Sequence, residues 1–166
     1  MIQLCLFRHA KSSWDDPRLA DEERPLTPKG IARAIKVSKY LAGQGFHPDL
    51  LVSSPAVRAY YTAMLAAREL GYPAERIVIA REIYEGPADR VLDLIYGTDN
   101  KVASLMIFGH NPTITDLANL FLRPGIPDMQ TSAAVGINFE ASGWEEIMRV
   151  PAIKAFHVYP AKLKKR

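Results

Sequence analysis

The segment Leu4-Cys5-Leu6-Phe7 is an apolar run that ends abruptly in Arg8 and His9. A short, continuously apolar run predicts a strand that is buried on both faces, as in the middle of a parallel sheet. In open α/β sheets, ligands bind beyond the carboxyl ends of such strands. Arg8 and His9 are therefore expected to reach a ligand site, where the guanidinium favours an anion and the imidazole could act as nucleophile, base or ligand.

Predicted strands and helices alternate along the chain up to residue 122. After the first strand, further strands are expected over 49–53, 76–80, 104–108, 134–139, 146–150 and 155–159. Helices are expected from Pro28 to about Gly43, from Ser54-Pro55 to Gly71, over 88–96, and through Ile114 to Phe121, the first two beginning with a cap residue and a proline. This alternation predicts a single α/β domain with a mainly parallel central sheet and helices on both faces.

The composition is typical of a globular protein. A chain of 166 residues is long enough for one compact domain, and its apolar share of 48% excludes a disordered or fibrous class. No apolar run approaches the ~20 residues that span a bilayer, and the N-terminus does not resemble a signal peptide, so no membrane partner is expected. The sole cysteine, Cys5, lies in the apolar strand, which indicates an inert core thiol and a cytoplasmic protein.

The basic residues are concentrated at the C-terminus. The formal net charge is +3, and four cationic residues account for more than all of it: Lys162, Lys164, Lys165 and Arg166. A solvated basic end differs from a basic stripe along one face, so no nucleic-acid partner is expected. We expect a domain over residues 1–160 and a basic tail over 161–166.

Three further polar residues stand where predicted strands end. Arg58 falls in the first turn of a helix, near the positive end of the helix dipole, which is a poor place for a cation unless an anion binds there. His110 follows the fourth predicted strand, and Glu82 lies in a polar turn after the third. Together with Arg8 and His9, these residues would form a phosphate site at one edge of the sheet.

The motifs that carry these residues resemble those of the histidine phosphatase superfamily. They are Arg8-His9-Ala10-Lys11-Ser12, Arg24-Pro25-Leu26-Thr27-Pro28-Lys29-Gly30, Ser53-Ser54-Pro55-Ala56-Val57-Arg58-Ala59 with Thr62-Ala63, and Gly109-His110-Asn111-Pro112. Their order and the short chain are similar to the SixA-type phosphohistidine phosphatases in particular. The resemblance implies a phosphoglycerate mutase-like fold without a large cap insertion.

The resemblance also implies the roles of the central residues. His9 would be the nucleophile, forming a phosphohistidine that water then hydrolyses, while the phosphoryl oxygens would be held by Arg8, Arg58 and His110. Positive neighbours lower the pKa of an imidazole, so Arg8 and Arg58 would keep His9 neutral and able to attack near neutral pH. No metal or cofactor is expected.

The proton donor and the other substrate contacts leave alternatives open. Glu82 matches the acid of a Glu-x-x-x-Gly turn, Glu85 is a rival, and SixA-type members can lack a dedicated acid. Asp15 stands where mutase-like members have an asparagine near the phosphate. Because a carboxylate would repel the phosphate, we expect Asp15 to point elsewhere and Ser12 to contribute a hydroxyl. Asn111 is a further expected substrate-binding residue.

Other phosphatase chemistries lack their residues in this sequence. Cys5 has no arginine six residues later, and neither clustered metal ligands nor a Gly-x-x-x-x-Gly-Lys loop occurs. His47 and His157 have no partner motif and are expected to be ordinary residues.

The substrate class is predicted from the space over the site. Between Glu82 and His110 the sequence has room for one short helix and one strand, whereas sugar-phosphate mutases carry a large insertion. We expect an open pocket suited to phosphohistidine on a partner protein. The alternatives are a small-molecule phosphomonoesterase and a non-catalytic module that binds a phospho-ligand.

Overall fold

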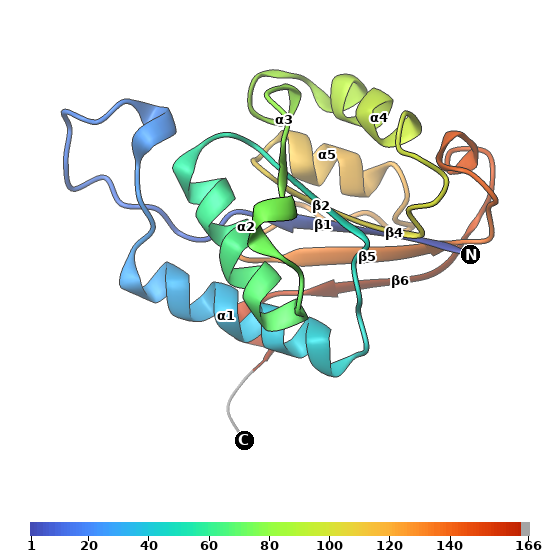
Figure 1. Ribbon diagram of the computed structural model, residues 1–166, viewed down its shortest axis with the longest axis horizontal. Helices are drawn as coiled ribbons and strands as arrows, with labels where there is room; N and C mark the ends of the chain where they lie inside the picture. The colour runs from blue at the N-terminus through green and yellow to red at the C-terminus, as the bar shows by residue number, and fades with distance from the viewer. Residues whose placement is uncertain (164–166) are drawn as a thin grey trace.

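One sheet brings strands from both ends of the chain together. The computed structural model describes residues 1–163 and has six strands in the order β3-β2-β4-β1-β5-β6 (Figure 1). The strands are β1 (Ile2–Arg8), β2 (Leu50–Ser53), β3 (Val78–Ile79), β4 (Ser104–Gly109), β5 (Ala134–Phe139) and β6 (Ala152–Val158). β1 to β4 are mutually parallel, and β5 runs antiparallel between β1 and β6. The sheet is therefore mixed but mostly parallel, as predicted.

Helices cover both faces of this sheet (Figure 1). They are α1 (Pro28–Gly43), α2 (Val57–Leu70), α3 (Glu82–Glu85), α4 (Ala88–Tyr96) and α5 (Thr113–Asn119). Side chains alternate along β1, so Cys5 and Phe7 join the core on the side of α1 and α2, whereas Leu4 and Leu6 join the core on the side of α4 and α5. The prediction of a single α/β domain with a two-sided core is confirmed.

α1 begins as the sequence predicts. Thr27 caps the helix, because its Oγ1 accepts a 2.9 Å hydrogen bond from the Gly30 N–H, and Pro28 occupies the first helical position. The Thr27 N–H donates to the Lys11 carbonyl at 2.9 Å and ties the helix start to the segment after β1. A Cβ on Gly30 would collide with that carbonyl, so glycine permits the close approach.

α2 begins later than predicted. Ser54 and Pro55 precede the helix, whose N-cap is Ala56 and whose first residue is Val57. The Ser54 Oγ accepts a 3.1 Å hydrogen bond from the Ala56 N–H and so closes a turn before the helix instead of capping it. Arg58 remains in the first turn of α2, where the sequence places it.

The strand predicted over residues 146–150 is wrong. A 3-10 turn, η3 (Trp144–Glu146), ends at Glu146, residues 147–150 form turns and a bend, and extended structure resumes only at β6. Ser142 donates its N–H and its hydroxyl to the Glu146 carboxylate at 2.9 and 3.1 Å, and the fully buried Trp144 donates to a main-chain carbonyl at 2.8 Å. These side-chain hydrogen bonds stabilise a turn in place of a strand.

The last described residues pack against the domain. Pro160–Lys162 forms a 3-10 turn, Leu163 packs against the core on the side of α1, and the Lys162 Nζ donates to the His157 carbonyl at 2.9 Å. Residues 164–166 of the predicted basic tail lie outside the described residues, so the predicted tail and domain boundary stay predictions. Within residues 1–163, no helix is long and apolar enough to cross a membrane.

Gly30→Ala is expected to destabilise the protein by about 1–3 kcal/mol, because the new methyl group must displace the main chain at Lys11. Gly43→Ala is the matched control in the same helix. No atom lies within 4 Å of its added Cβ, so it should raise stability by up to ~1 kcal/mol or leave it unchanged. Urea unfolding followed by circular dichroism measures both, and equal midpoints for the two variants would contradict the packing argument.

Candidate active site

The predicted site residues gather at one edge of the sheet. β2, β4 and β1 are parallel neighbours, so their carboxyl ends meet, and the segments that carry Arg58, His110 and His9 begin there. A pocket of about 270 Å³ opens at this edge, and its walls are formed by Arg8, His9, Lys11, Ser12, Trp14, Arg24, Arg58, His110, Asn111 and Thr131. Of the predicted site residues, Glu82 does not line the pocket.

His9 is held in one tautomer. The His9 N–H donates to the Gly109 carbonyl at 3.0 Å, and the ring Nδ1 lies 2.7 Å from the Ala10 carbonyl oxygen. Because a carbonyl only accepts, Nδ1 carries the ring proton and Nε2 keeps a lone pair. Burial lowers the pKa of His9 to about 4, and the charges of Arg58 and Arg8 act in the same direction. The ring is therefore neutral near pH 7.

Thr62 joins the His9 turn to the helix that carries Arg58. Its Oγ1 accepts a 2.9 Å hydrogen bond from the Ala10 N–H and donates to the Arg58 carbonyl at 2.7 Å. Thr62 is fully buried, so both hydrogen bonds are shielded from water. The Thr62-Ala63 pair is part of the sequence motif, but the sequence alone assigns it no role.

The two predicted phosphate-binding arginines are both anchored at one end. Arg8 donates from Nη1 to the Met129 carbonyl at 2.8 Å, and Arg58 donates from Nη1 to the Asp21 carbonyl at 2.7 Å and from Nη2 to the Asp21 Oδ2 at 3.0 Å. The Nε atom of each arginine is buried and has no hydrogen-bond partner. Buried donors without a protein partner commonly serve a ligand.

His110 lies beside His9 with its ring oriented by a serine. Its Nε2 is 2.7 Å from the Ser54 Oγ, and its ring centroid is 5.1 Å from that of His9. Burial lowers the pKa of His110 to about 3, and the neighbouring His9 and Arg58 lower it further. Its Nδ1 is buried without a partner, like the arginine Nε atoms.

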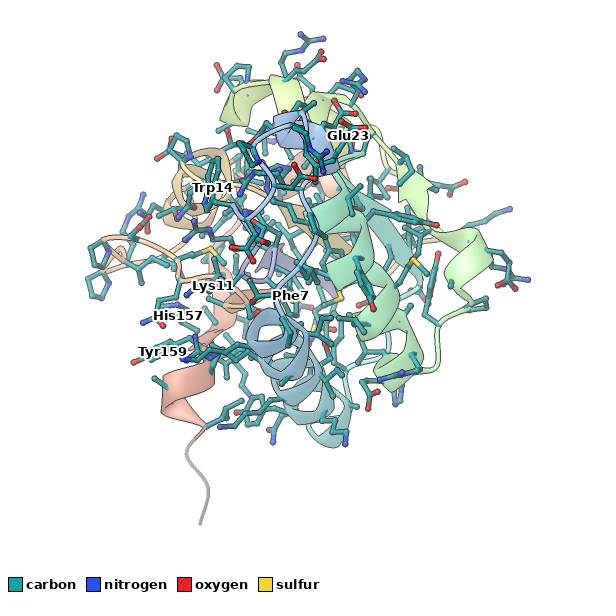
Figure 2. All side chains as sticks on the ribbon, turned by 90° about the vertical axis from the view of Figure 1, so that its left-hand side faces the viewer. Phe7, Lys11, Trp14, Glu23, His157 and Tyr159 are labelled. Atoms are coloured by element: carbon teal, nitrogen blue, oxygen red, sulfur yellow. The ribbon has the colours of Figure 1, made fainter. Side chains whose placement is uncertain are left out.

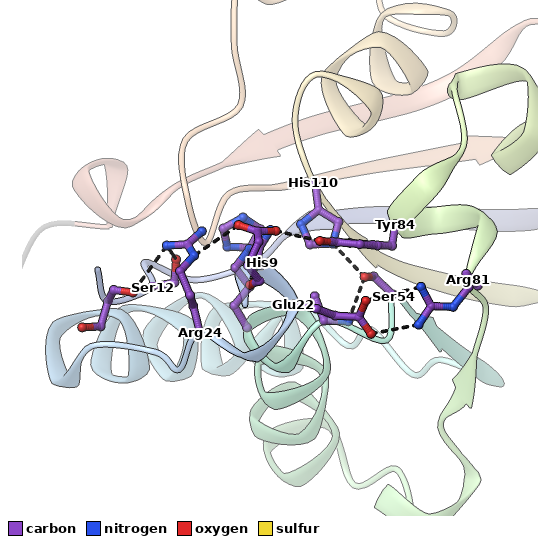
Figure 3. Close-up of polar contacts among 12 residues, drawn as sticks. His9, Ser12, Glu22, Arg24, Ser54, Arg81, Tyr84 and His110 are labelled. Atoms are coloured by element: carbon purple, nitrogen blue, oxygen red, sulfur yellow. Dashed lines mark hydrogen bonds and ion pairs between the residues drawn. The ribbon is translucent and has the colours of Figure 1, made fainter. Parts of the chain in front are cut away.

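Arg24 is a pocket residue to which the sequence analysis gave no role. Only 7% of it is exposed, its Nη1 donates to the Ser12 Oγ at 3.0 Å, and its guanidinium carbon lies 3.4 Å from the centre of the Trp14 ring. Figure 3 shows Arg24 and Ser12 on the side of His9 opposite to Tyr84. The only sequence signal that could have marked Arg24 as a site residue was its place in the Arg-Pro-Leu-Thr motif. The Ser12 hydroxyl faces Arg24 at the pocket wall, and its contact with substrate stays a prediction.

Asp21 and Tyr84 are the other residues that sequence reasoning missed. Asp21 lies in the 3-10 turn η1 (Asp21–Glu23), and its Oδ2 accepts a 2.8 Å hydrogen bond from the Tyr84 hydroxyl. This hydrogen bond and those from Arg58 lower the pKa of Asp21 to about 2. No motif marks either residue, because their contact spans two segments far apart in the sequence.

Glu82 and Glu85 lie in the short helix α3. Glu85 forms a 2.8 Å ion pair with Arg81 at the surface. Neither the Glu82 nor the Glu85 carboxylate lines the pocket. The proton-donor role of Glu82 stays a prediction that the pocket geometry does not support.

Asn111 lines the pocket, but its amide is engaged in holding a neighbouring loop. Its Nδ2 donates to the Asp128 Oδ1 at 2.7 Å and to the Met129 carbonyl at 2.9 Å, while its Oδ1 accepts from the Thr115 hydroxyl at 2.6 Å. These contacts fit a positioning role for the loop better than the predicted substrate contact. Asp15 is exposed and does not line the pocket, as expected.

Metal ligands and a second groove also bear on the choice of site. Within residues 1–163, no three His, Cys, Asp or Glu side chains come together to hold a metal ion. A larger groove of about 660 Å³ lies between β6 and the segment after α5, and its walls include Phe121, Ile126 and Ile153. His157 is the only histidine that lines this groove, so the convergence of polar groups favours the smaller pocket as the active site.

His9 is expected to stay neutral in the folded protein down to about pH 5, with its proton on Nδ1, since burial lowers its pKa to about 4. Long-range ¹H–¹⁵N NMR of the histidine rings distinguishes the two neutral tautomers and the charged form. His9→Gln identifies the resonances. A titration midpoint near 6.5, or a proton on Nε2, would contradict the assignment.

The lowered pKa of His9 also predicts how the free energy of unfolding depends on pH. The unfolded chain takes up a proton on His9 near its ordinary pKa of 6.5, whereas the folded protein does so only near pH 4. The free energy of unfolding therefore falls as the pH falls through this window. His9→Gln should show a smaller fall in stability between pH 6.5 and pH 4 than the unaltered protein.

Comparisons with known proteins agree with this geometry. The phosphohistidine phosphatase SixA of Escherichia coli K12 is 26% identical over 144 residues, which cover 86% of this chain and 88% of SixA. The structure of the protein histidine phosphatase SixA complexed with tungstate superposes with a TM-score of 0.83 at 23% identity, covering 98% of this chain and all of that chain. It supports a SixA-like, phosphoglycerate mutase-like fold.

A more similar relative and a family match decide the classification. An uncharacterized chloroplastic protein of Arabidopsis thaliana is 31% identical over 153 residues, which cover 87% of this chain and 69% of that protein. Residues 4–95, more than half of the chain, match the histidine phosphatase superfamily (branch 1). They include His9 and Arg58, which the structure places in one pocket. The chain therefore belongs to branch 1 of the histidine phosphatase superfamily.

Proposed function

We propose that this protein is a metal-independent phosphatase that removes the phosphoryl group from phosphohistidine on a partner protein through a covalent phosphohistidine on His9. The observation that carries the proposal is the neutral His9 ring, whose Nε2 keeps its lone pair in a pocket lined by Arg8 and Arg58. Phosphoryl transfer needs a positioned nucleophile and neutralisation of charge on the phosphoryl oxygens. This pocket supplies both.

The reaction proceeds in two steps. The lone pair of the His9 Nε2 forms a bond to phosphorus while the P–N bond of the substrate breaks, and the substrate imidazole leaves with that electron pair. Protonation of its other ring nitrogen by solvent lets it leave as neutral imidazole. Water then attacks the phosphorus, the bond to Nε2 breaks, and phosphate leaves with the proton lost to solvent. Arg8, Arg58 and His110 stabilise the equatorial oxygens in both steps.

The surroundings of the pocket support a protein substrate. Between α3 and β4 the chain forms only α4 and short connections, so no inserted domain encloses the site. Trp14, at the pocket wall, is 75% exposed. An open pocket with an exposed aromatic side chain suits a phosphorylated side chain that another protein presents.

A thiol-based mechanism is not supported by the position of the cysteine. Cys5 is fully buried in β1, and burial raises its pKa to about 12. The thiol is therefore protonated near neutral pH, and a protonated thiol is a poor nucleophile.

His9→Ala is expected to abolish turnover of 4-nitrophenyl phosphate and of a phosphohistidine protein while leaving the fold intact. Quenching the unaltered enzyme during turnover with denaturant at alkaline pH should trap acid-labile phosphate on His9, measured by mass spectrometry without acid treatment of the peptides. His47→Ala, which changes an exposed histidine outside the pocket, is the control and should keep full activity. The assays contain a chelator, since no step uses a metal. Label on Cys5, or activity lost to the chelator and restored by Mg²⁺, would refute the mechanism.

The leaving group separates the proposed substrate class from a general phosphomonoesterase. The imidazole of phosphohistidine leaves readily once its ring is protonated. Phosphoserine must instead expel an alkoxide, and its hydrolysis needs a positioned acid. We expect good activity on phosphohistidine and aryl phosphates, weak activity on phosphoserine, and little effect of Glu82→Gln on the phosphohistidine rate. High activity on phosphoserine that Glu82→Gln removes would favour the phosphomonoesterase. Binding of phosphate without turnover would favour the binding module.

A further inference from the structure

The pocket places several positive charges close together. Four cationic side chains line it, those of Arg8, Lys11, Arg24 and Arg58, and among the residues described as its walls there is no carboxylate. Arg24 and Arg58 are each only 7% exposed, so little water screens their repulsion. Without a counter-ion, these two side chains would favour rotamers that reach solvent. Their inward position before substrate binds therefore requires an anion nearby.

Asp21 provides that anion from outside the pocket wall. Its Oδ1 accepts from the Arg24 Nε at 3.2 Å, and its Oδ2 accepts from the Arg58 Nη2 at 3.0 Å. One carboxylate thus bridges the two guanidinium groups and fixes the spacing between them. The Asp21 main-chain carbonyl adds a second contact to Arg58, 2.7 Å from its Nη1.

The contacts with Asp21 leave part of the Arg58 guanidinium free. The group donates through Nε and both Nη atoms, and Asp21 accepts only from the Nη end. The Nε is buried without a partner in a pocket-lining side chain. Asp21 therefore orients Arg58 by one edge and leaves donors on the other edge available for an anion.

Asp21 is itself held from two sides. The Tyr84 hydroxyl donates to its Oδ2 at 2.8 Å, and the neighbouring Glu22 forms a 2.8 Å ion pair with Arg81, which precedes α3. Figure 3 shows Glu22 paired with Arg81, and Tyr84 reaching from α3 toward the site. The lowered pKa of Asp21, about 2, keeps its carboxylate charged in neutral solution. The turn that carries Asp21 is therefore anchored to α3 and to Arg81 before it, independently of Arg24 and Arg58.

We propose that Asp21 is a positioning residue that joins Arg24 and Arg58 into one anion-binding pair, so that a phosphoryl group meets both guanidinium groups already in place. The proposal rests on the proposed phosphatase function. It assigns to Arg24 a role in substrate binding that the sequence motif alone does not specify.

Asp21→Asn removes the charge and one acceptor, and it is expected to lower kcat/KM for 4-nitrophenyl phosphate between about 10-fold and about 10²-fold. Because Asp21 acts on the phosphoryl oxygens through Arg24 and Arg58, the same factor should apply to phenyl phosphate, which has a more basic leaving group. Glu23→Gln is the matched control, since the Glu23 carboxylate lies in the same turn but accepts from the Ala20 N–H. It should keep full activity.

A double-mutant cycle with Arg58→Ala separates positioning from other roles. Asp21→Asn should have a clearly smaller effect when Arg58 is already absent, because only Arg24 is then left for Asp21 to position. Equal losses in both backgrounds would overturn the proposal, as would a loss that grows with leaving-group basicity, which would make Asp21 a proton donor. A loss from Glu23→Gln as large as that from Asp21→Asn would also overturn it, because the turn as a whole would then be responsible.

Binding of orthovanadate keeps the test independent of turnover. Asp21→Asn should weaken vanadate binding, and by a smaller factor in the Arg58→Ala background than in the unaltered background; tighter or unchanged binding in the unaltered background would contradict the proposal. If the unaltered enzyme hydrolyses no phosphate ester or phosphohistidine, the proposed function fails while the vanadate cycle still decides the role of Asp21. Tyr84→Phe, which removes only the hydroxyl that holds Asp21, should weaken vanadate binding less than Asp21→Asn. If Asp21→Asn does not fold, Tyr84→Phe takes its place in the test.

Discussion

The hydrogen bonds at the carboxyl end of β1 are the constraint on which the site depends. The Arg8 N–H donates to the Ala133 carbonyl on the β5 side, and the His9 N–H donates to the Gly109 carbonyl on the β4 side, both at 3.0 Å. β1 is thus held between two strands up to its last residue. The next peptide is held as well, since the Ala10 N–H donates to Thr62. The main chain at His9 is therefore fixed, the ring Nδ1 is held by the Ala10 carbonyl, and burial of the ring in this position lowers its pKa.

Much of this could be predicted from the sequence, because the determining signals are local. The apolar runs of β1 and β4 mark strands that are covered on both faces, and the residues that follow such strands meet at one edge of a parallel sheet. Arg8, His9 and His110 needed only this argument. The prediction for Arg58 also required the start of its helix. Arg58 lies in the first turn of α2 even though α2 begins later than the Ser54-Pro55 signal indicates.

The main error and the main omission depend on side-chain hydrogen bonds, several of them between segments far apart in the sequence. Residues 146–150 have the composition of a strand, yet the buried Trp144 and the Glu146 carboxylate stabilise a turn there. Asp21 looks like a loop carboxylate in the sequence, and only the folded chain brings it to Arg58 and Tyr84. Glu82 had the better sequence signal for a functional acid, but its short helix leaves it outside the pocket wall. Periodicity and motif spacing carry no information about such pairs.

The protonation states of the site limit what it can do to a leaving group. His9 and His110, with pKa values of about 4 and about 3, are neutral and hold no readily donated proton near pH 7. Asp21, with a pKa of about 2, is ionised, and the hydrogen bond to Asp21 raises the pKa of Tyr84 above its ordinary value, which makes it a weaker acid. These four groups therefore protonate a departing alkoxide poorly. This supports the proposed substrate class, since a phosphorylated imidazole, which solvent can protonate, needs less help from an enzyme acid than an alkyl phosphate does.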